Sequence, residues 1–401
     1  MKLKSILLIM PYGSVGGMER LALNFYNHYK AQGYQVKGLK FIKLDNDIIN
    51  FGEDELFFKP YDFVSMSKME RLLFYVKAPY LINKLIKKYN ITYSIAFGDM
   101  ANLFSSLSFS KEYKIGSVHA LKSVELKHDS LFNKLTKLGY KTSYKFLNKL
   151  VCISKAIKED LIENCDYKFS NLEVIYNPHD IAHITQLSKE HIDCNEELDI
   201  FSKPTILFLG RLSIQKAPWH LIKAFSIVNT KNKGVNLVII GDGDINVINY
   251  INKLIKILDI ENQVFLLGRK NNPYKYIKAA KVLALTSYYE GTPNVIVESI
   301  AVGTPIVSTY CTKGITELMS LYDHNGEVDN IVTESGIVTP NIFEGNLEIP
   351  SNFDITTKDN NIAEAILLIL NDIGFNNRLG MHKHELLSKF DLETVANKYL
   401  K

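Results

Sequence analysis

The sequence predicts an α/β protein with two facing, doubly wound, Rossmann-like domains and a cleft between them. Short apolar runs alternate with helical segments through both halves of the chain, which is typical of doubly wound parallel sheets. A chain of 401 residues is also too long for one ordinary core, so two domains of about 200 residues are expected. The polar run 186–204 is interpreted as the linker between domains at residues 1–185 and 205–385.

The composition is that of a soluble globular protein, with 46% hydrophobic and 22% charged residues. The four cysteines show no paired or tight spacing, which argues against a zinc site and a disulfide framework. Residues 5–10 are too short an apolar run for a signal peptide, and no stretch reaches the roughly 18–20 apolar residues of a transmembrane helix. We therefore expect a cytoplasmic protein whose membrane contact, at the inner face of the cytoplasmic membrane, is peripheral.

The charge is distributed unevenly along the chain. Residues 59–158 hold 18 lysines and arginines against 6 aspartates and glutamates, a difference of +12, so the remainder carries about −8 of the net +4. No nucleic-acid module is recognisable, so an anionic membrane surface or a diphosphate-linked lipid is the favoured partner and nucleic acid is not expected. A merely solvated, lysine-rich surface is the alternative. The best candidate for a membrane-surface helix is the stretch 126–150, with lysines at Lys127, Lys134, Lys137, Lys141, Lys145 and Lys149.

The first domain is expected to open with a strand at 6–9, a glycine loop at 13–17 and a helix that ends at Gly33. Gly16 and Gly17 then lie at a cleft edge that suits a phosphate or an acceptor. The loop does not match G-x-G-x-x-G, so a dinucleotide fingerprint is not supported. Residues 48–59 are expected to be irregular, and residues 66–89 to form a helix interrupted near Pro79. Further strands are expected at 36–42, 92–97, 115–118, 151–154 and 174–176.

His119 follows the expected strand 115–118 directly. The carboxyl ends of strands are where open parallel sheets place ligands, which makes His119 a candidate site residue. A lone histidine is more often an ordinary core or surface residue, and that reading stays open here.

The second domain is expected to open with a strand at 205–209, followed by Gly210, Arg211 and Lys216. Two cations five residues apart after a strand can hold one diphosphate, because arginine supplies a planar fork and lysine a point charge. Two exposed, unrelated cations are the alternative. Further strands are expected at 236–240, 264–267 and 306–308, and residues 323–360 are expected to be mostly loop.

Residues 282–309 hold the most informative pattern of the chain: strand, Gly/Pro turn, short helix, Gly-Thr-Pro turn and strand. Pro293 suits the first helical turn, so the amides of roughly residues 292–295 can hold an anionic group. Glu290 precedes the helix and Glu298 lies about two turns along it, so both carboxylates can accept hydrogen bonds from hydroxyls. A phosphorylated sugar fits such a site, whereas two unrelated surface carboxylates are the alternative.

At this point the sequence resembles a known family. Glu290 and Glu298 stand in the frame E-G-T-P-N-x3-E-S-x-A-x-G-T-P-I-V, which closely resembles the signature of the retaining glycosyltransferases of family 4. The G-R-x4-K run from Gly210 to Lys216 resembles the diphosphate clamp of that family, with Ala217 in place of its usual glycine. The loop G-G-x-E-R and the turn N-P-H-D at 177–180 are also similar, with a methionine and a proline at positions where the family usually has a smaller residue.

The resemblance implies the two-domain GT-B fold and an enzyme similar to bacterial surface-polysaccharide glycosyltransferases. It implies retaining, metal-independent transfer of a hexose or N-acetylhexosamine from a nucleotide sugar, with a UDP-sugar expected, to a glycan acceptor. The acceptor is expected to be a polyprenyl-diphosphate-linked glycan of capsule, O-antigen or lipopolysaccharide biosynthesis. No cofactor is expected. By the same resemblance the last helix, about 386–401, packs back on the first domain.

The resemblance also implies roles for the candidate residues. His119 would lie near the donor sugar, Glu290 would accept from the sugar hydroxyls, and Glu298 would accept from the ribose hydroxyls. Arg211 and Lys216 would stabilise the leaving diphosphate. The remaining donor-binding candidates are Arg269, near the base, and Gly291, Thr292, Asn294 and Val295 in the loop of amides.

Two other functions stay open. A nucleotide-sugar epimerase of the same fold needs acid and base carboxylates in its cleft. A non-catalytic sugar-nucleotide-binding partner subunit would not need the intact set of Arg211, Lys216, Glu290 and Glu298.

Overall fold

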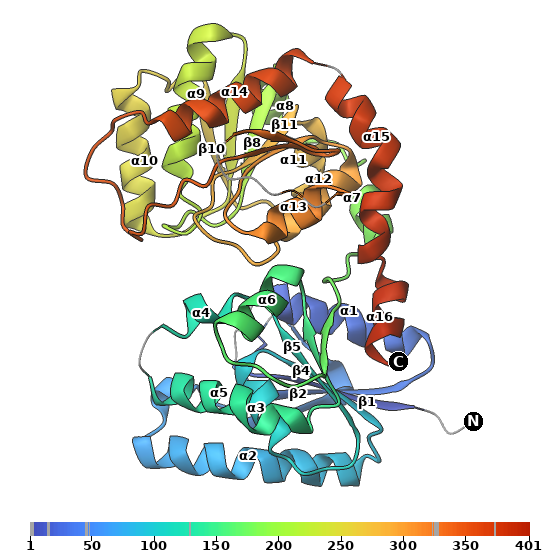
Figure 1. The fold of residues 1–401 in the computed structure, drawn as a ribbon. Helices are drawn as coiled ribbons and strands as arrows, with labels where there is room; N and C mark the ends of the chain where they lie inside the picture. Colours follow the sequence, from blue (N-terminus) through green and yellow to red (C-terminus); the bar gives the residue numbers. More distant parts are fainter. Residues whose placement is uncertain are drawn as a thin grey trace. The chain divides into compact units, whose positions relative to one another are not determined.

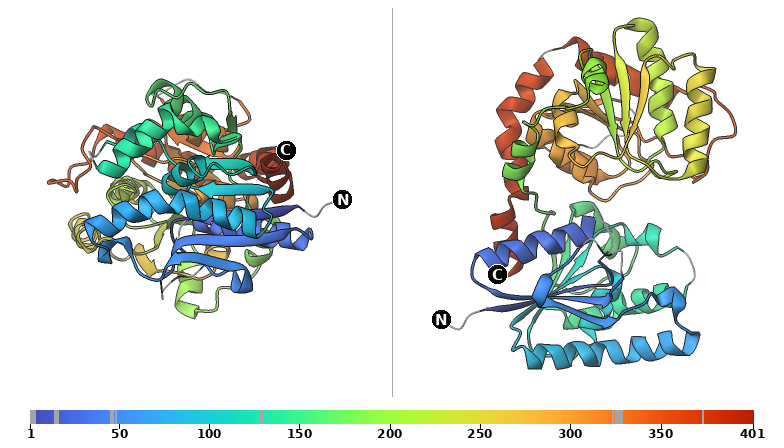
Figure 2. Two further views of the ribbon diagram at one scale, coloured as in Figure 1. Left: turned by 90° about the horizontal axis from the view of Figure 1, so that it is seen from below. Right: turned by 180° about the vertical axis from the view of Figure 1, so that it is seen from behind.

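The computed structural model describes residues 4–13, 17–44, 47, 49–127, 130–322, 324, 329–372 and 374–401. The chain forms two compact units, one reaching to Pro178 and including Leu392–Lys401, the other His179–Asp391 (Figure 1). Each unit is built on a seven-stranded sheet with helices on both faces (Figure 2). The predicted fold class of two Rossmann-like, doubly wound domains is therefore confirmed.

The first unit has the strand order β3-β2-β1-β4-β5-β6-β7, and all of its strand pairs are parallel. Its strands are β1 (Ser5–Met10), β2 (Gln35–Ile42), β3 (Glu55–Lys59), β4 (Tyr93–Phe97), β5 (Tyr113–Val118), β6 (Lys149–Cys152) and β7 (Leu172–Val174). Its helices are α1 (Gly17–Ala31), α2 (Lys68–Lys88), α3 (Asp99–Ser106), α4 (Lys122–Glu125), α5 (Leu131–Lys141), α6 (Lys155–Glu163) and α16 (Leu392–Tyr399). Short 3₁₀ turns lie at η1 (Gly52–Asp54), η2 (Phe63–Ser65) and η3 (Ser143–Phe146).

Strand β1 shows why this sheet is covered on both faces. All six of its residues are apolar or small and all are buried. Because side chains alternate along a strand, Leu7 and Ile9 enter one core while Ile6, Leu8 and Met10 enter the other.

The C-terminal helix α16 belongs to the core of the first unit. Tyr399 is fully buried and its ring contacts that of Phe25 on α1, with the centroids 4.8 Å apart. The Tyr29 hydroxyl donates a hydrogen bond of 2.9 Å to the Ala396 carbonyl oxygen. The end of the chain therefore completes a core that its beginning starts.

The second unit has the strand order β10-β9-β8-β11-β12-β14-β13, parallel except for the antiparallel pair β13/β14. Its strands are β8 (Thr205–Leu209), β9 (Asn236–Ile240), β10 (Val264–Gly268), β11 (Val282–Leu285), β12 (Ile306–Thr309), β13 (Ile331–Val332) and β14 (Gly336–Thr339). Its helices are α7 (Ile181–Leu187), α8 (Asn195–Phe201), α9 (Pro218–Lys231), α10 (Ile245–Ile257), α11 (Tyr274–Ala279), α12 (Asn294–Val302), α13 (Lys313–Met319), α14 (Thr357–Asn371) and α15 (Gly374–Leu387), with a 3₁₀ turn at η4 (Ser388–Phe390).

The boundary between the units differs from the expected one. The first unit reaches to Pro178, and the expected linker 186–204 is part of the second unit, where it contains α8. Glu197 of α8 forms an ion pair with Lys270 at 2.6 Å and accepts a hydrogen bond of 2.6 Å from the Tyr276 hydroxyl. The run is polar because it attaches to the unit through charged and hydrogen-bonding groups.

Several segment predictions of the first unit were wrong. The helix around Pro79 is not interrupted, because α2 continues through Pro79 with Phe74, Ala78 and Ile82 packed beneath it. Residues 48–59 contain the edge strand β3, whose Glu55 forms an ion pair of 2.9 Å with the buried Lys40.

The stretch 126–150 is not one helix either. It comprises α5, η3 and the start of β6, so Lys149 is buried in the sheet. There the Lys149 ammonium donates to the Lys398 carbonyl oxygen at 2.8 Å and pairs with Glu173 at 3.1 Å. Lys149 therefore does not belong to a membrane-facing surface.

The expected loop 323–360 contributes strands β13 and β14 to the second sheet. A Cβ at Gly336 would lie 1.9 Å from the Ile306 carbonyl oxygen, so a glycine is needed where β14 meets β12. No helix in the described part of the chain is long and apolar enough to cross a membrane.

Candidate functional site

The second sheet changes winding direction beside β8. From β8 the chain proceeds to β9 and β10 on one side and then returns to form β11 on the other side of β8. The loops after β8 and β11 therefore meet at the carboxyl edge of the sheet, where open α/β sheets bind ligands. Both clusters of candidate donor-binding residues lie in these two loops.

The loop after β8 is held close to the loop after β9. The Leu212 amide donates to the Asp242 carbonyl oxygen at 2.8 Å, and the Asp244 amide donates to the Leu212 carbonyl oxygen at 2.8 Å. A Cβ at Gly243 would lie 2.1 Å from that Leu212 oxygen, so only glycine permits this approach. The path from Arg211 toward Lys216 is thus fixed by backbone contacts.

Hydrogen bonds also join the loop after β8 to the loop after β11. The Tyr288 amide donates to the Gln215 carbonyl oxygen at 2.8 Å, and the Gln215 side-chain amide donates to the Tyr289 carbonyl oxygen at 3.0 Å. The Thr286 hydroxyl donates to the carbonyl oxygens of Lys216 and Ala217. The two loops therefore form one hydrogen-bonded unit.

Lys216 and Glu290 meet where these loops join. The Lys216 ammonium forms an ion pair with Glu290 Oε1, and the Ser287 hydroxyl donates to the same oxygen at 2.8 Å. Only 19% of the Lys216 side chain and 11% of the Glu290 side chain are exposed. The structure thus brings together the two predicted residues that are 74 positions apart.

The N-terminus of α12 borders the Glu290 loop. Its N-cap residue, Pro293, makes no side-chain capping hydrogen bond, so the first amides of α12 are not capped in this way. The Thr292 hydroxyl is buried and has no hydrogen-bond partner among the described residues. Asn294 and Val295 open the helix, and Glu298 lies half-buried further along it. Uncapped helical amides and a free hydroxyl suit an anionic ligand.

Two further candidates carry exposed guanidinium groups. Arg211 is exposed at the start of the β8 loop. Arg269 follows β10, where its guanidinium forms an ion pair of 2.9 Å with Asp242 and is 79% exposed. The Gly291 carbonyl oxygen lies close to Gly314 of α13. A Cβ at Gly314 would lie only 2.6 Å from this oxygen.

A buried network of hydrogen-bonded side chains contacts the Glu290 loop, and the sequence did not predict this network. His220 Nδ1 lies 2.6 Å from an Asp359 carboxylate oxygen, and its Nε2 lies 3.3 Å from the Tyr288 hydroxyl. The Trp219 indole N–H donates to the same hydroxyl at 3.3 Å. Tyr288 precedes Glu290 by two residues, so this network fixes the loop that carries the carboxylate.

The first sheet changes direction between β1 and β4 in the same way. Gly16 lies outside the described residues, and Gly17 begins α1. Met18, where the family usually has a smaller residue, packs against Gly98, at which a Cβ would lie 2.9 Å from the Met18 sulfur. Glu19, the residue after Met18 on α1, is buried, and burial raises the pKa of its carboxyl.

His119 lies at the carboxyl end of β5, as predicted. Its Nε2 is 2.8 Å from the Ser117 hydroxyl oxygen. Burial, with the nearby positive charge of Lys122, lowers the pKa of His119 to about 3. His119 is therefore neutral near pH 7 and can donate or accept a hydrogen bond without carrying charge.

A charged cluster beside His119 was not predicted. The buried Lys122 ammonium lies 3.0 Å from an Asp99 carboxylate oxygen and 2.5 Å from Glu125, and the Tyr140 hydroxyl donates to Asp99 at 3.0 Å. These groups come from α3, α4 and α5, so no sequence spacing could have revealed them.

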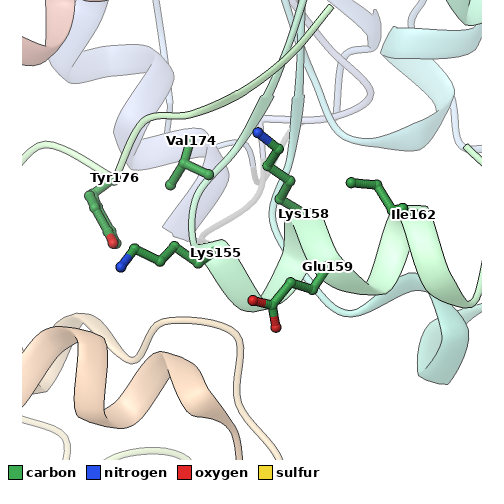
Figure 3. A pocket seen from close by; sticks show the side chains of 6 residues that line it. All are labelled: Lys155, Lys158, Glu159, Ile162, Val174 and Tyr176. Carbon is green, nitrogen blue, oxygen red and sulfur yellow. The ribbon is translucent and has the colours of Figure 1, made fainter. Parts of the chain in front are cut away.

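Described residues of the first unit line at least two cavities. One, of about 530 Å³, is formed by the start of α6 and the segment after β7 (Figure 3). Its lining residues are Lys155, Lys158, Glu159, Ile162, Val174 and Tyr176. The other, of about 510 Å³, lies among α4, α5 and α6 and includes Lys122, Lys127, Lys137 and Lys141 in its lining. Both linings combine lysines with acidic side chains, Glu159 in the first and Glu163 and Asp166 in the second.

The described residues contain no group of three His, Cys, Asp or Glu side chains placed to hold a metal ion. Cys311 lies beside Glu290, where burial and that carboxylate raise the pKa of its thiol, so the thiol stays protonated.

Comparisons with known proteins agree with this architecture. A model described as Glycosyltransferase Family 4 matches residues 15–183, and one described as Glycosyl transferases group 1 matches residues 195–329. The solved structure of Anabaena HepE in complex with UDP and glucose superposes with a TM-score of 0.71 over 99% of this chain and 98% of that one, at 19% identity. By its fold the chain is thus of the two-domain GT-B type.

Among curated proteins, an uncharacterized glycosyltransferase of Methanocaldococcus jannaschii is 28% identical over 61% of this chain and 62% of its own length. A Campylobacter jejuni N-acetylgalactosamine-N,N'-diacetylbacillosaminyl-diphospho-undecaprenol 4-alpha-N-acetylgalactosaminyltransferase is 36% identical over 44% of this chain and 46% of its own length. These alignments therefore span less than two thirds of each relative. The chain belongs to the glycosyltransferases, with a family 4 domain followed by a group 1 domain.

Proposed function

We propose that the protein transfers a hexose or N-acetylhexosamine from a UDP-sugar to a lipid-linked glycan acceptor, with retention of the anomeric configuration. The observation that carries this proposal is the Lys216–Glu290 pair beside the uncapped N-terminus of α12. A cation and free amides suit a diphosphate, and carboxylates suit sugar hydroxyls. The UDP and glucose named for the Anabaena structure support this type of donor.

In this mechanism Arg211, Lys216 and the first amides of α12 bind the donor diphosphate. Glu298 accepts hydrogen bonds from the ribose hydroxyls, Glu290 accepts from the sugar hydroxyls, and Arg269 lies near the base. The bond between the sugar C1 and the phosphate oxygen breaks while a bond from C1 to the acceptor oxygen forms on the same face. The proton of the acceptor hydroxyl passes to the departing phosphate oxygen.

The leaving group is stabilised by fixed cations and helix amides, so no metal ion is required. His119, neutral at physiological pH, is assigned to hydrogen-bond the donor sugar. No side chain has to act as a covalent nucleophile in this scheme.

The acceptor binds the first domain, where lysines line both cavities. A polyprenyl diphosphate carries the anionic group that such cavities suit, and the diphospho-undecaprenol in the name of the Campylobacter relative supports this class. The first domain works at an anionic membrane surface on the cytoplasmic side, in the assembly of a capsule, O-antigen or lipopolysaccharide glycan.

The function is tested by incubating the protein with a panel of nucleotide sugars and a polyprenyl-diphosphate-linked glycan and weighing the products by mass spectrometry. A gain of one hexose or N-acetylhexosamine is expected with at least one UDP-sugar. An epimerase would instead convert the nucleotide sugar without any acceptor, and a non-catalytic partner subunit would bind the nucleotide and yield no product.

A further inference from the structure

Helix α2 carries an apolar stripe on its solvent side. Its members are Met69, Leu72, Leu73, Val76 and Tyr80, which are between 50% and 70% exposed. The spacing of three and four residues places them on one side of the helix, while Phe74, Ala78, Ile82 and Ile86 pack on the core from the other side. Single exposed apolar residues are ordinary, but a stripe of five along one helix marks an interaction surface.

Helix α5, beside α2, also exposes apolar side chains. The Tyr75 ring of α2 contacts the Phe132 ring of α5, with the centroids 6.3 Å apart, so the two helices lie side by side (Figure 1). Leu131 and Leu138 of α5 lie one above the other at an interval of seven residues and are 63% and 55% exposed. We call these two residues, together with the α2 stripe, the α2–α5 face.

Cations border the α2–α5 face on both sides. Helix α2 carries six lysines and arginines and one acid, Glu70, whereas α5 carries three lysines and no acid. Helical spacing places Lys77, Lys84 and Lys88 along the edge of the stripe that lies away from α5. On α5, Lys134 and Lys137 are exposed beyond Leu131 and Leu138, whereas the Lys141 ammonium forms an ion pair of 3.0 Å with Asp166. Glu70 forms an ion pair with Lys59 at 3.0 Å, so it offsets little of this charge.

We propose that the α2–α5 face docks the protein on an anionic phospholipid bilayer, with the apolar band inserted among the acyl chains and the lysines among the headgroups. This inference rests on the proposed function, because it explains how the enzyme reaches a lipid-linked acceptor. An apolar band between rows of lysines is the pattern of an interfacial helix. A second copy of the chain fits less well, because self-association through this face would bring like-charged lysine rows together.

The test is vesicle flotation of the full-length protein with phosphatidylcholine vesicles that contain either no or about one third phosphatidylglycerol, at low and high salt. The wild type is expected to float with the anionic vesicles and to lose most of this binding at high salt. The triple variants Leu72→Ser/Leu73→Ser/Val76→Ser and Lys77→Gln/Lys84→Gln/Lys88→Gln should each lower the partition coefficient about tenfold or more.

The matched control is Ile245→Ser/Ile257→Ser, at two exposed positions of α10 in the second unit, and it should bind within about twofold of the wild type. Circular dichroism spectra confirm that each variant is folded. A Leu73→Trp variant should show a blue-shifted emission on anionic vesicles, since the single native tryptophan, Trp219, is fully buried and stays unchanged.

Absence of wild-type flotation, or an apolar triple variant that floats like the wild type, would overturn the proposal. The proposal would also be overturned if sedimentation found a dimer that the apolar substitutions dissociate and if no vesicle binding occurred. Transfer to an acceptor with a short, soluble lipid tail and calorimetric UDP binding are measured in parallel. Vesicle binding without transfer would refute the proposed function alone, whereas transfer without vesicle binding would refute docking alone.

Discussion

At the scale of single residues, the Lys216–Glu290 ion pair is the centre of the proposed donor site. Both side chains are largely buried, and the carboxylate is fixed by a second donor, Ser287. A lysine held in this way loses little conformational freedom when it meets a diphosphate, which is the condition for strong electrostatic stabilisation of a leaving group.

Lys216→Ala should lower kcat/KM about 10²- to 10³-fold, equivalent to roughly 2–4 kcal/mol of transition-state stabilisation, and Arg211→Ala should act in the same direction. The matched control is Lys231→Ala at the exposed end of α9. Steady-state measurement of kcat/KM for the wild type, the two site variants and the control tests this prediction. Values within threefold of the wild type for both site variants would refute the diphosphate clamp.

The two carboxylates should separate in binding and catalysis. Glu298 is assigned to the ribose, so Glu298→Gln should weaken calorimetric binding of free UDP by about tenfold, as loss of a charged hydrogen-bond acceptor would. Glu290→Gln should leave UDP binding within about threefold and slow the transfer step, because its partner hydroxyls belong to the sugar. The opposite pattern would exchange the two roles.

His119 should make stability depend on pH. The pKa of an unfolded histidine is near 6.5, and burial lowers that of His119 to about 3, so the native state binds fewer protons than the unfolded state in acid. Its contribution is complete above pH 6.5 and is lost as the pH falls toward 3. Between pH 7 and pH 5 the loss amounts to at most about 2 kcal/mol.

Urea unfolding of the wild type and of His119→Asn at these two pH values measures the effect of His119. The variant should retain a pH dependence of similar size that comes from His179, whose pKa burial lowers to about 4. An identical pH dependence in both proteins would show that His119 does not remain neutral in the folded state.

At the scale of elements, apolar periodicity predicted most strands and helices. Strands β8 and β9 have the expected limits, because each is a compact apolar run between clear turn residues. Periodicity could not show which side of α2 is buried, since both of its sides are apolar. Nor could it separate Lys149 from its exposed neighbours, because the partners of Lys149 at Glu173 and Lys398 depend on tertiary contacts.

Helix α16 provides a direct stability test. Tyr399→Ala should cost about 3–5 kcal/mol in free energy of unfolding, as other large aromatic deletions in cores do. Tyr399→Phe should cost nothing or stabilise, because the Tyr399 hydroxyl is buried without a hydrogen-bond partner among the described residues. Denaturant titration of the two variants checks this pair of expectations. A large loss in Tyr399→Phe would mean that the hydroxyl has a partner.

At the scale of the whole molecule, the two Rossmann-like sheets could be predicted from sequence, and the donor site remains a proposal. The motifs around Arg211, Lys216, Glu290 and Glu298 are local, so one sequence displays them. The supports of the site are not local. His220, Asp359 and Tyr288 are more than 60 residues apart along the chain and meet only in the fold. Asp99 and Lys122, beside His119, are 23 residues apart and also meet only in the fold.

The central claim is retaining, metal-independent transfer from a UDP-sugar. It is tested most directly by running the reaction with a polyprenyl-diphosphate-linked glycan in EDTA and determining the anomeric configuration of the new linkage by NMR. An α-linked product from an α-linked donor, formed at a rate that EDTA does not change, is the predicted result. A β-linked product, or activity that disappears in EDTA and returns with Mn²⁺ or Mg²⁺, would contradict it.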